Sequence, residues 1–147
     1  MRRPKRLEVI LVRLCNETIT VFNRRIDAST GYEVYKPTVI QGVSWFCRIE
    51  SVVNDGLKAA NAISIRIPKT ANANGKRYVD PVTYKNATSV DGIFTLANGD
   101  IIVKAVANNN NATPAELKAA YADYCTILGV TDNRRAPNAP HFKVVGS

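Results

Sequence analysis

Apolar and polar residues alternate along several short stretches of the chain, which is the period of a half-buried β-strand. In residues 18–22, Ile19 and Val21 share one face, and in residues 63–67 three isoleucines do so. Other stretches are rich in apolar and β-branched residues, namely 32–35, 43–49, 101–106, 125–130 and 141–145. We therefore expect most of the chain to form strands.

Turn residues divide these stretches. Asp55-Gly56 is a pair favoured in tight hairpin turns, so we expect the strands on either side of it to pair. Asn98-Gly99 predicts a second hairpin, between residues 93–96 and 101–106. Similar signals predict a sheet edge or bend at Pro37, a β-bulge at Gly42 and a turn at residues 131–133.

A single helix is expected, at about residues 114–124. Thr113 and Glu116 have the spacing of a capping box, and Pro114 stands at the first helical position. Leu117 begins an apolar stripe at helical spacing that continues through Ala120, Tyr121 and Tyr124. Residues 69–90, by contrast, are polar and rich in turn formers, which indicates a long loop.

Together these elements predict a mainly β fold. About seven to nine strands joined by local hairpins favour an antiparallel β-barrel or sandwich with one short helix and long loops. The 147 residues suffice for one domain, which we place at 16–147, after a basic N-terminal extension at 1–15. No stretch approaches the ~20 apolar residues of a membrane-spanning helix, so we expect no membrane partner.

Charge narrows the choice of partners. The net charge is +8, and a basic excess attracts anions, chiefly nucleic acid or acidic surfaces. Residues 1–13 carry +4 and residues 69–85 carry +3. Solvent-exposed charge without a partner explains these residues equally well. The candidate contact residues are Arg2, Arg3, Lys5, Arg6, Lys69, Lys76, Arg77, Lys85, Arg134 and Arg135.

Candidate chemistry is sparse. His141 is the single histidine and has no cysteine or carboxylate at ligand spacing. The three cysteines, Cys15, Cys47 and Cys125, lie far apart in sequence, and we expect buried free thiols in a reducing compartment. The apolar run after the basic start is interrupted by charges, so it does not form a secretory signal. We expect no catalytic residue, metal or cofactor, and hence no enzyme.

Several strings resemble a family of small prophage proteins from Firmicutes that belong to the head–tail joining region of tailed phages. The resemblance covers residues 17–146. The strings are Thr20-Val21-Phe22-Asn23-Arg24, Gly42-Val43-Ser44-Trp45, Lys76-Arg77-Tyr78-Val79-Asp80-Pro81, residues 96–104, Thr131-Asp132-Asn133-Arg134-Arg135-Ala136-Pro137 and residues 140–146.

The resemblance implies a structural protein of the virion, assembled in the cytoplasm of the bacterial host. The implied role is a head-completion or stopper-like neck subunit. Its copies form a ring between the portal or adaptor side and the tail terminator or tail tube, around the DNA channel. Adaptor, stopper and tail terminator all remain open as the neck position. Contact with packaged DNA would be independent of sequence. The alternative is a small nucleic-acid-binding β-barrel, whose affinity falls steeply with salt.

Overall fold

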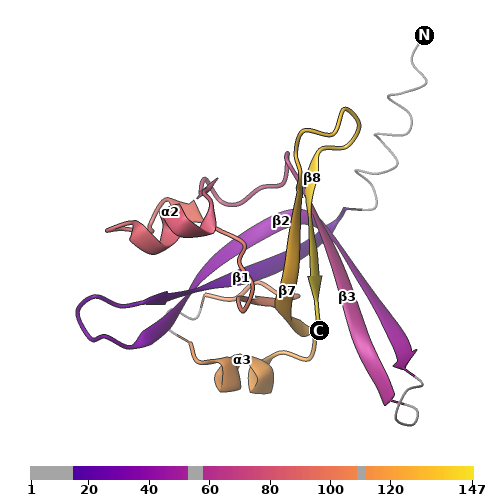
Figure 1. Ribbon diagram of the computed structural model, residues 1–147, viewed down its shortest axis with the longest axis horizontal. Coiled ribbons are helices and arrows are strands. Elements are labelled where there is room, and N and C mark those ends of the chain that lie inside the picture. The colour runs from indigo at the N-terminus through magenta and orange to yellow at the C-terminus, as the bar shows by residue number, and fades with distance from the viewer. Residues whose placement is uncertain (1–14, 53–57, 109–111) are drawn as a thin grey trace.

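A computed structural model describes residues 15–52, 58–108 and 112–147 (Figure 1). The described part is mainly β, as the alternation predicts. Its strands are β1 (Glu17–Ile26), β2 (Glu33–Val52), β3 (Lys58–Pro68), β4 (Arg77–Tyr78), β5 (Ile93–Phe94), β6 (Ile101–Val103), β7 (Tyr124–Asn133) and β8 (His141–Gly146). Its helices are α2 (Pro81–Asn86) and α3 (Pro114–Ala120).

Six strands close into a barrel in the order β1-β2-β3-β8-β7-β6. Every neighbouring pair in this ring is antiparallel. The prediction of an antiparallel barrel or sandwich is therefore confirmed, and closure makes it a barrel. Closure joins β6 to β1, so the ring has no terminal strand.

Alternation along β1 divides the core in two. Ile19 and Val21 point into the barrel, where they join side chains such as Ile65 and Val144. Phe22 points outward and is also fully buried, because it packs with Leu117 of α3 in a second apolar cluster. The helix thus covers the outer side of β1 and β6, and Figure 1 shows α3 beneath them.

β2 is long enough to pair with two different strands along its length. Its first half pairs with β1 and its second half with β3. Gly42 lies between these halves with φ +86°, beside a register shift, so the predicted bulge is confirmed. Pro37 lies in the half that pairs only with β1, which leaves its nitrogen on a sheet edge, as expected.

The β2–β3 hairpin extends past the barrel as a two-stranded arm. β8 pairs with β3 only from Ile63 onward, whereas β2 and β3 remain paired as far as Val52 and Lys58. The arm is therefore residues 48–52 and 58–62, and Figure 1 shows it projecting away from the barrel. The expected pairing is confirmed, while the Asp55-Gly56 turn lies outside the described residues.

The hairpin predicted at residues 93–106 is wrong. Gly99 does turn, with φ +92°, but β5 pairs in parallel with β4, and β6 pairs with β1 and β7. The physical reason is competition for backbone groups. The Asn23 side chain bonds both the N–H and the carbonyl of Thr95, and Asp100 accepts the N–H of Ala97. These groups are therefore not available to a β5–β6 ladder.

The helices differ from expectation in two ways: α3 is shorter than predicted, and a second helix is present. The capping box at Thr113 and Glu116 is confirmed, but α3 ends at Ala120, and Tyr124 already belongs to β7. The region expected to be a loop contains α2, which is capped by the Asp80 carboxylate and begins with Pro81.

Two smaller predictions are also wrong. Residues 131–133 complete β7, and the turn begins at Arg134, because β7 stays paired with β8 as far as Asn133. Of the three thiols only Cys125 is buried, while Cys15 is half-buried and Cys47 is exposed where β2 leaves the barrel. None of the described helices is long and apolar enough to cross a bilayer.

Candidate interaction surface

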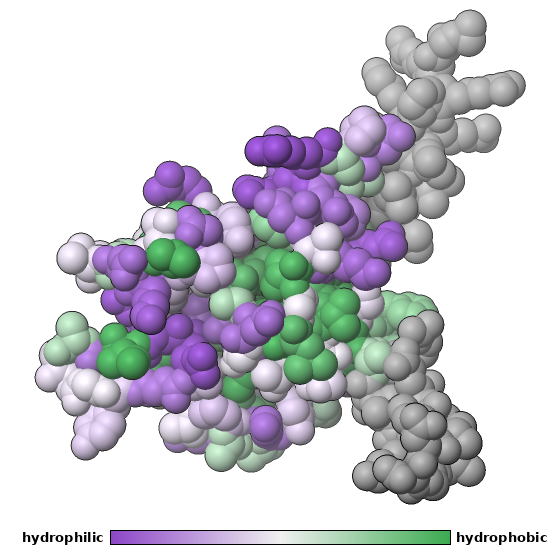
Figure 2. Space-filling model, viewed as in Figure 1, coloured by the Kyte–Doolittle hydropathy of each residue, from purple (hydrophilic) through white to green (hydrophobic). Residues whose placement is uncertain are grey.

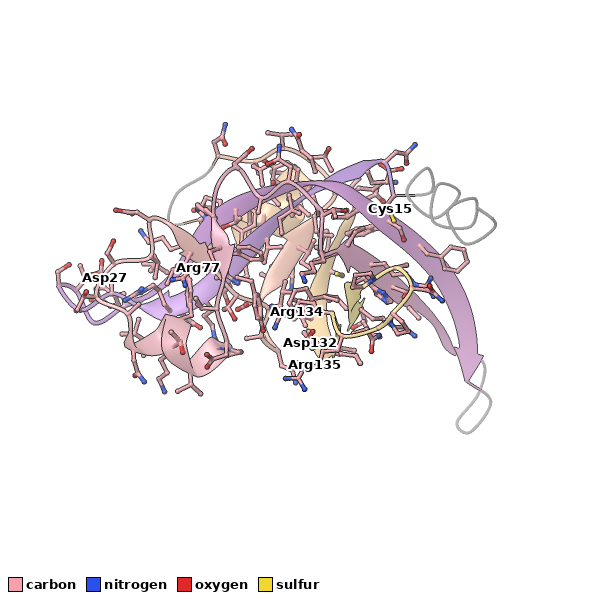
Figure 3. The ribbon with its side chains drawn as sticks, turned by 90° about the horizontal axis from the view of Figure 1, so that it is seen from above. Cys15, Asp27, Arg77, Asp132, Arg134 and Arg135 are labelled. Carbon is pink, nitrogen blue, oxygen red and sulfur yellow. The ribbon has the colours of Figure 1, made fainter. Side chains whose placement is uncertain are left out.

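The predicted contact residues are scattered, and only three gather at one place. Arg2, Arg3, Lys5 and Arg6 lie outside the described residues. Lys69, Arg134 and Arg135 line a common hollow of about 420 Å³ together with Asp132. In Figure 3, Asp132, Arg134 and Arg135 lie close together, with Arg77 apart from them. Lys85 is exposed at the end of α2.

Strand order explains why the hollow forms. β8 lies between β3 and β7, so the end of β3 and the β7–β8 turn meet at one end of the barrel. The two segments are joined by a hydrogen bond from the N–H of Lys69 to the carbonyl of Pro140, at 2.9 Å. Residues more than sixty positions apart therefore share one surface.

Arg134 is fully engaged within the chain. Its Nε and Nη2 donate to Oδ1 and Oδ2 of Asp132 at 2.9 and 2.8 Å, and its backbone N–H donates to Oδ1 at 3.0 Å. The guanidinium also lies over two aromatic rings, 4.9 Å from the centre of Tyr78 and 4.7 Å from that of Phe142. These contacts fix the position of the guanidinium, and its bidentate hydrogen bonds are already made to Asp132.

Electrostatics within the hollow follow from this pair. The hydrogen bond from Arg134, aided by the charge of Arg135, lowers the pKa of Asp132 from 3.8 to about 2. Asp132 is therefore ionised at neutral pH and offsets one of the three cations. The remaining charge of +2 belongs in effect to Lys69 and Arg135, which form no ion pair within the described ranges. Such an arrangement suits a phosphate group.

Lys76 has a structural role instead. Its Nζ donates to the carbonyl of Pro37 at 2.9 Å and to Oγ1 of Thr38 at 3.2 Å. Burial lowers the pKa of Lys76, the direction expected when an ammonium group leaves water. The side chain ties the segment after β3 to the edge of β2, so it is not presented to an outside partner.

A second polar cluster lies in the interior, where β1 meets the turn before β6. Asp100 accepts hydrogen bonds from Arg24 N–H at 3.0 Å, Ala97 N–H at 3.1 Å and Asn23 Nδ2 at 2.8 Å. Burial raises the pKa of Asp100, against the opposing effect of these hydrogen bonds. Every contact is internal, so the cluster fixes the chain path and presents nothing to a ligand.

Sequence reasoning missed Asp132, which lines the hollow, and the two rings that lie against Arg134, those of Tyr78 and Phe142. The spacing of Asp132 and Arg134 across a turn is a usable signal, because an aspartate commonly bonds the chain two residues on. The aromatic platform carries no such signal. Tyr78 and Phe142 are far apart in sequence, yet their ring centres lie 4.5 Å apart.

Within the ranges that the structure describes, no group of three or more His, Cys, Asp or Glu side chains is arranged to hold a metal ion.

Comparison with known proteins identifies a protein family, but one whose function is unknown. A model described as "Family of unknown function (DUF6751)" matches residues 14–147. No curated protein and no solved structure matches the chain.

Proposed function

The chain belongs to the DUF6751 family over residues 14–147, and we propose that it is a structural subunit of the head–tail connector of a tailed bacteriophage. Its copies form a ring, in the manner of a head-completion or stopper protein, between the portal side and the tail. The protein acts in the virion through surfaces that meet other proteins and the DNA channel.

The observation that carries this proposal is the arm joined to a closed barrel. A closed barrel has no free sheet edge at its core strands, which gives each subunit a rigid body. The arm, by contrast, pairs only with itself and adds nothing to the barrel ladder. Ordered strands that leave the body of a domain suit contact with a neighbouring subunit or ring.

The basic hollow supports a position beside DNA. With +8 on each copy, a ring carries a strongly positive field, and Lys69 and Arg135 add local cations that form no ion pair with any residue the structure describes. Contacts of this kind neutralise phosphates without reading bases. They fit a collar through which any genome sequence must pass.

Deletion of the gene from an inducible prophage tests the role. We expect heads that separate from tails and lose DNA, with plaque formation restored by the gene on a plasmid. Cryo-EM of complemented particles should trace the chain as a ring in the neck. Normal tailed particles from the deletion strain would overturn the proposal.

Shortening the arm separates its role from that of the barrel. A variant in which an Asn-Gly turn joins Arg48 to Ala62, which pair with each other in the β2–β3 ladder, keeps every barrel pair, since β8 pairs with β3 only from Ile63. We expect this variant to fold, with a thermal transition close to that of the wild type, yet to fail in complementation. Full complementation would show that the arm is dispensable.

A second candidate, a sequence-independent nucleic-acid-binding barrel, is favoured by the same hollow. It predicts that the purified monomer binds DNA at physiological salt. The double variant Lys69→Ala/Arg135→Ala would then lower the slope of log K against log salt by about 2, one for each lost phosphate contact. Arg134→Ala should change the slope less, because Arg134 is already paired with Asp132. Absence of binding by the wild type eliminates this candidate.

A further inference from the structure

A row of outward-facing residues, which includes the apolar Phe46 and Val145, crosses four barrel strands. Phe46 of β2 pairs with Ser64 of β3, Ser64 with Val145 of β8, and Val145 with Gly129 of β7. Residues directly opposite in a ladder share one face, so all four point outward together. With strands about 4.8 Å apart, the row is about 14 Å wide.

Large apolar side chains in and beside this row are exposed to solvent. Phe46 is 63 % exposed and Val145 40 %, and Leu128, the extra residue of the β7 bulge beside Gly129, is 59 % exposed. We call Phe46, Leu128 and Val145 the outer row. Figure 2 shows hydrophobic surface gathered where β3, β8 and β7 run side by side. A contiguous apolar patch on a protein surface commonly marks a contact site.

Cations border the outer row on one side. The next outward positions of the ladder are Arg66 on β3 and Lys143 on β8, which lie opposite each other. Both are exposed. Neither forms an ion pair within the described part of the chain. A partner for this face should therefore combine apolar side chains with carboxylates.

The chain carries such a surface itself, at the turn between β1 and β2. Ile26 and Tyr32 are 65 % and 76 % exposed there. Residues 26–33 contain two carboxylates, Asp27 and Glu33, and no cation. We call residues 26–33 the tip. It lies at one end of the long axis in Figure 1, well away from β3 and β8, so one molecule cannot bring the two surfaces together.

Internal hydrogen bonds make the tip rigid. The Asp27 carboxylate accepts from the N–H and hydroxyl of Ser29, at 2.9 and 2.8 Å. Two backbone bonds between residues 27 and 31–32 close the turn, and Gly31 takes the positive φ that the turn requires. A preordered loop loses little entropy on docking.

Of the cations at the base of the tip, Arg25 is bonded within the chain, and Arg24 forms an exposed ion pair that a partner's charges could replace. Arg25 donates to the carbonyl of Ala87 at 2.9 Å and lies over the ring of Tyr84. Arg24 pairs with Glu33 at 3.1 Å, but both side chains are half-exposed, and such pairs hold weakly. The hydrogen bonds from Ser29 lower the pKa of Asp27 most, and the charges of Lys36 and Arg25 lower it further. Asp27 therefore stays ionised on mild acidification.

We propose that the tip of one copy docks on the outer row of the next copy. Ile26 and Tyr32 cover Phe46, Leu128 and Val145, while Asp27 and Glu33 face Arg66 and Lys143. Because the two surfaces differ, the contact is head-to-tail, and repetition closes a ring or continues as a filament. This inference rests on the proposed ring-forming function and assigns the surfaces that would build the ring.

Cross-linking of the purified full chain tests the contact. In a background with Cys15→Ser and Cys47→Ser, the variant Tyr32→Cys/Leu128→Cys places one thiol on each surface, and buried Cys125 stays. With a short bismaleimide we expect a ladder of multimers. The matched control is Tyr32→Cys/Val106→Cys, because Val106 is 61 % exposed elsewhere on the surface. Equal cross-linking in the two variants, or none in either, would overturn the proposal.

Charge exchange provides an independent readout. Glu33→Lys and Lys143→Glu should each cut the yield of Tyr32–Leu128 cross-links at least about tenfold, and the two together should restore it. Lys118→Glu, an exposed cation on α3, is the control. Single losses without restoration would show that these surfaces do not meet each other. Cross-linking reports on this contact whatever the particle experiments show. A ring seen in the neck without this contact would refute the inference and leave the function standing.

Discussion

Two aspartates at different places in the barrel show how environment decides the role of one residue type. Asp100 is 2 % exposed and accepts three hydrogen bonds within the chain, two of them from backbone N–H groups. Asp132 is about half-exposed, and among the described residues its carboxylate bonds only Arg134. Burial raises the pKa of Asp100, whereas the arginine lowers that of Asp132 to about 2.

The difference teaches where this molecule is held together and where it meets the outside. Asp100 accepts hydrogen bonds where no β5–β6 ladder forms, so its loss leaves one buried side-chain donor and two partly buried backbone N–H groups without this acceptor. Asp132 holds one guanidinium in place beside cations that face water. The first cluster therefore serves the fold, and the second lies on the surface for which we propose contact with DNA.

The largest effect is expected from Asp100→Ala. One buried and two partly buried donors lose their acceptor, and we expect the free energy of unfolding to fall by about 2 kcal/mol. Urea denaturation at neutral pH measures this loss. The control Asp123→Ala removes an exposed carboxylate and should change stability by less than about 0.5 kcal/mol. Equal effects of the two substitutions would contradict the structural role.

A smaller effect is expected from Arg134→Ala. The variant loses an exposed ion pair and two contacts with aromatic rings, together about 1 kcal/mol. Arg134→Lys should recover less than half, because an ammonium group cannot bond Asp132 with two parallel N–H groups. Arg135→Ala is the matched control, with almost no change in the urea midpoint. A larger loss from Arg135→Ala would reverse the assignment of the two arginines.

The smallest effect is expected from Asp132→Asn, and it depends on pH. The folded pKa of about 2 lies below the ordinary value of 3.8, so ionised Asp132 stabilises the fold above pH 3.8. Because the pair is solvent-exposed, we expect only about 0.5 kcal/mol. The difference between wild type and variant should shrink as the pH falls from 3.8 through about 2. A difference that stays constant over this range, in urea titrations at several pH values, would show that the charge is not responsible.

Much of the fold was predictable because it depends on local patterns. The alternation at residues 18–22 placed Ile19 and Val21 in the barrel, and the helix start at Thr113 followed from a capping box. The bulge at Gly42 was visible because glycine alone takes that backbone conformation readily. The hairpin at Asn98-Gly99 failed because the deciding partner, Asn23, lies more than seventy residues earlier.

The candidate site was predictable only in part. Charge along the chain identified Lys69, Arg134 and Arg135 as cations, but not Lys76 as one that is bonded to the edge of β2. Sequence also gave no sign that Tyr78 and Phe142 lie beneath Arg134. Which charges face a partner depends on distances between strands that are remote in sequence.

The sequence by itself determined the β-rich class, the positions of most strands and the basic charge, because alternation, turn residues and composition act over a few residues. Only the tertiary structure decided that six strands close into a barrel, that β5 pairs with β4 and not with β6, and that the β7–β8 turn meets the end of β3. Those outcomes come from long-range pairing. In such pairing, buried polar groups must find partners wherever the fold supplies them.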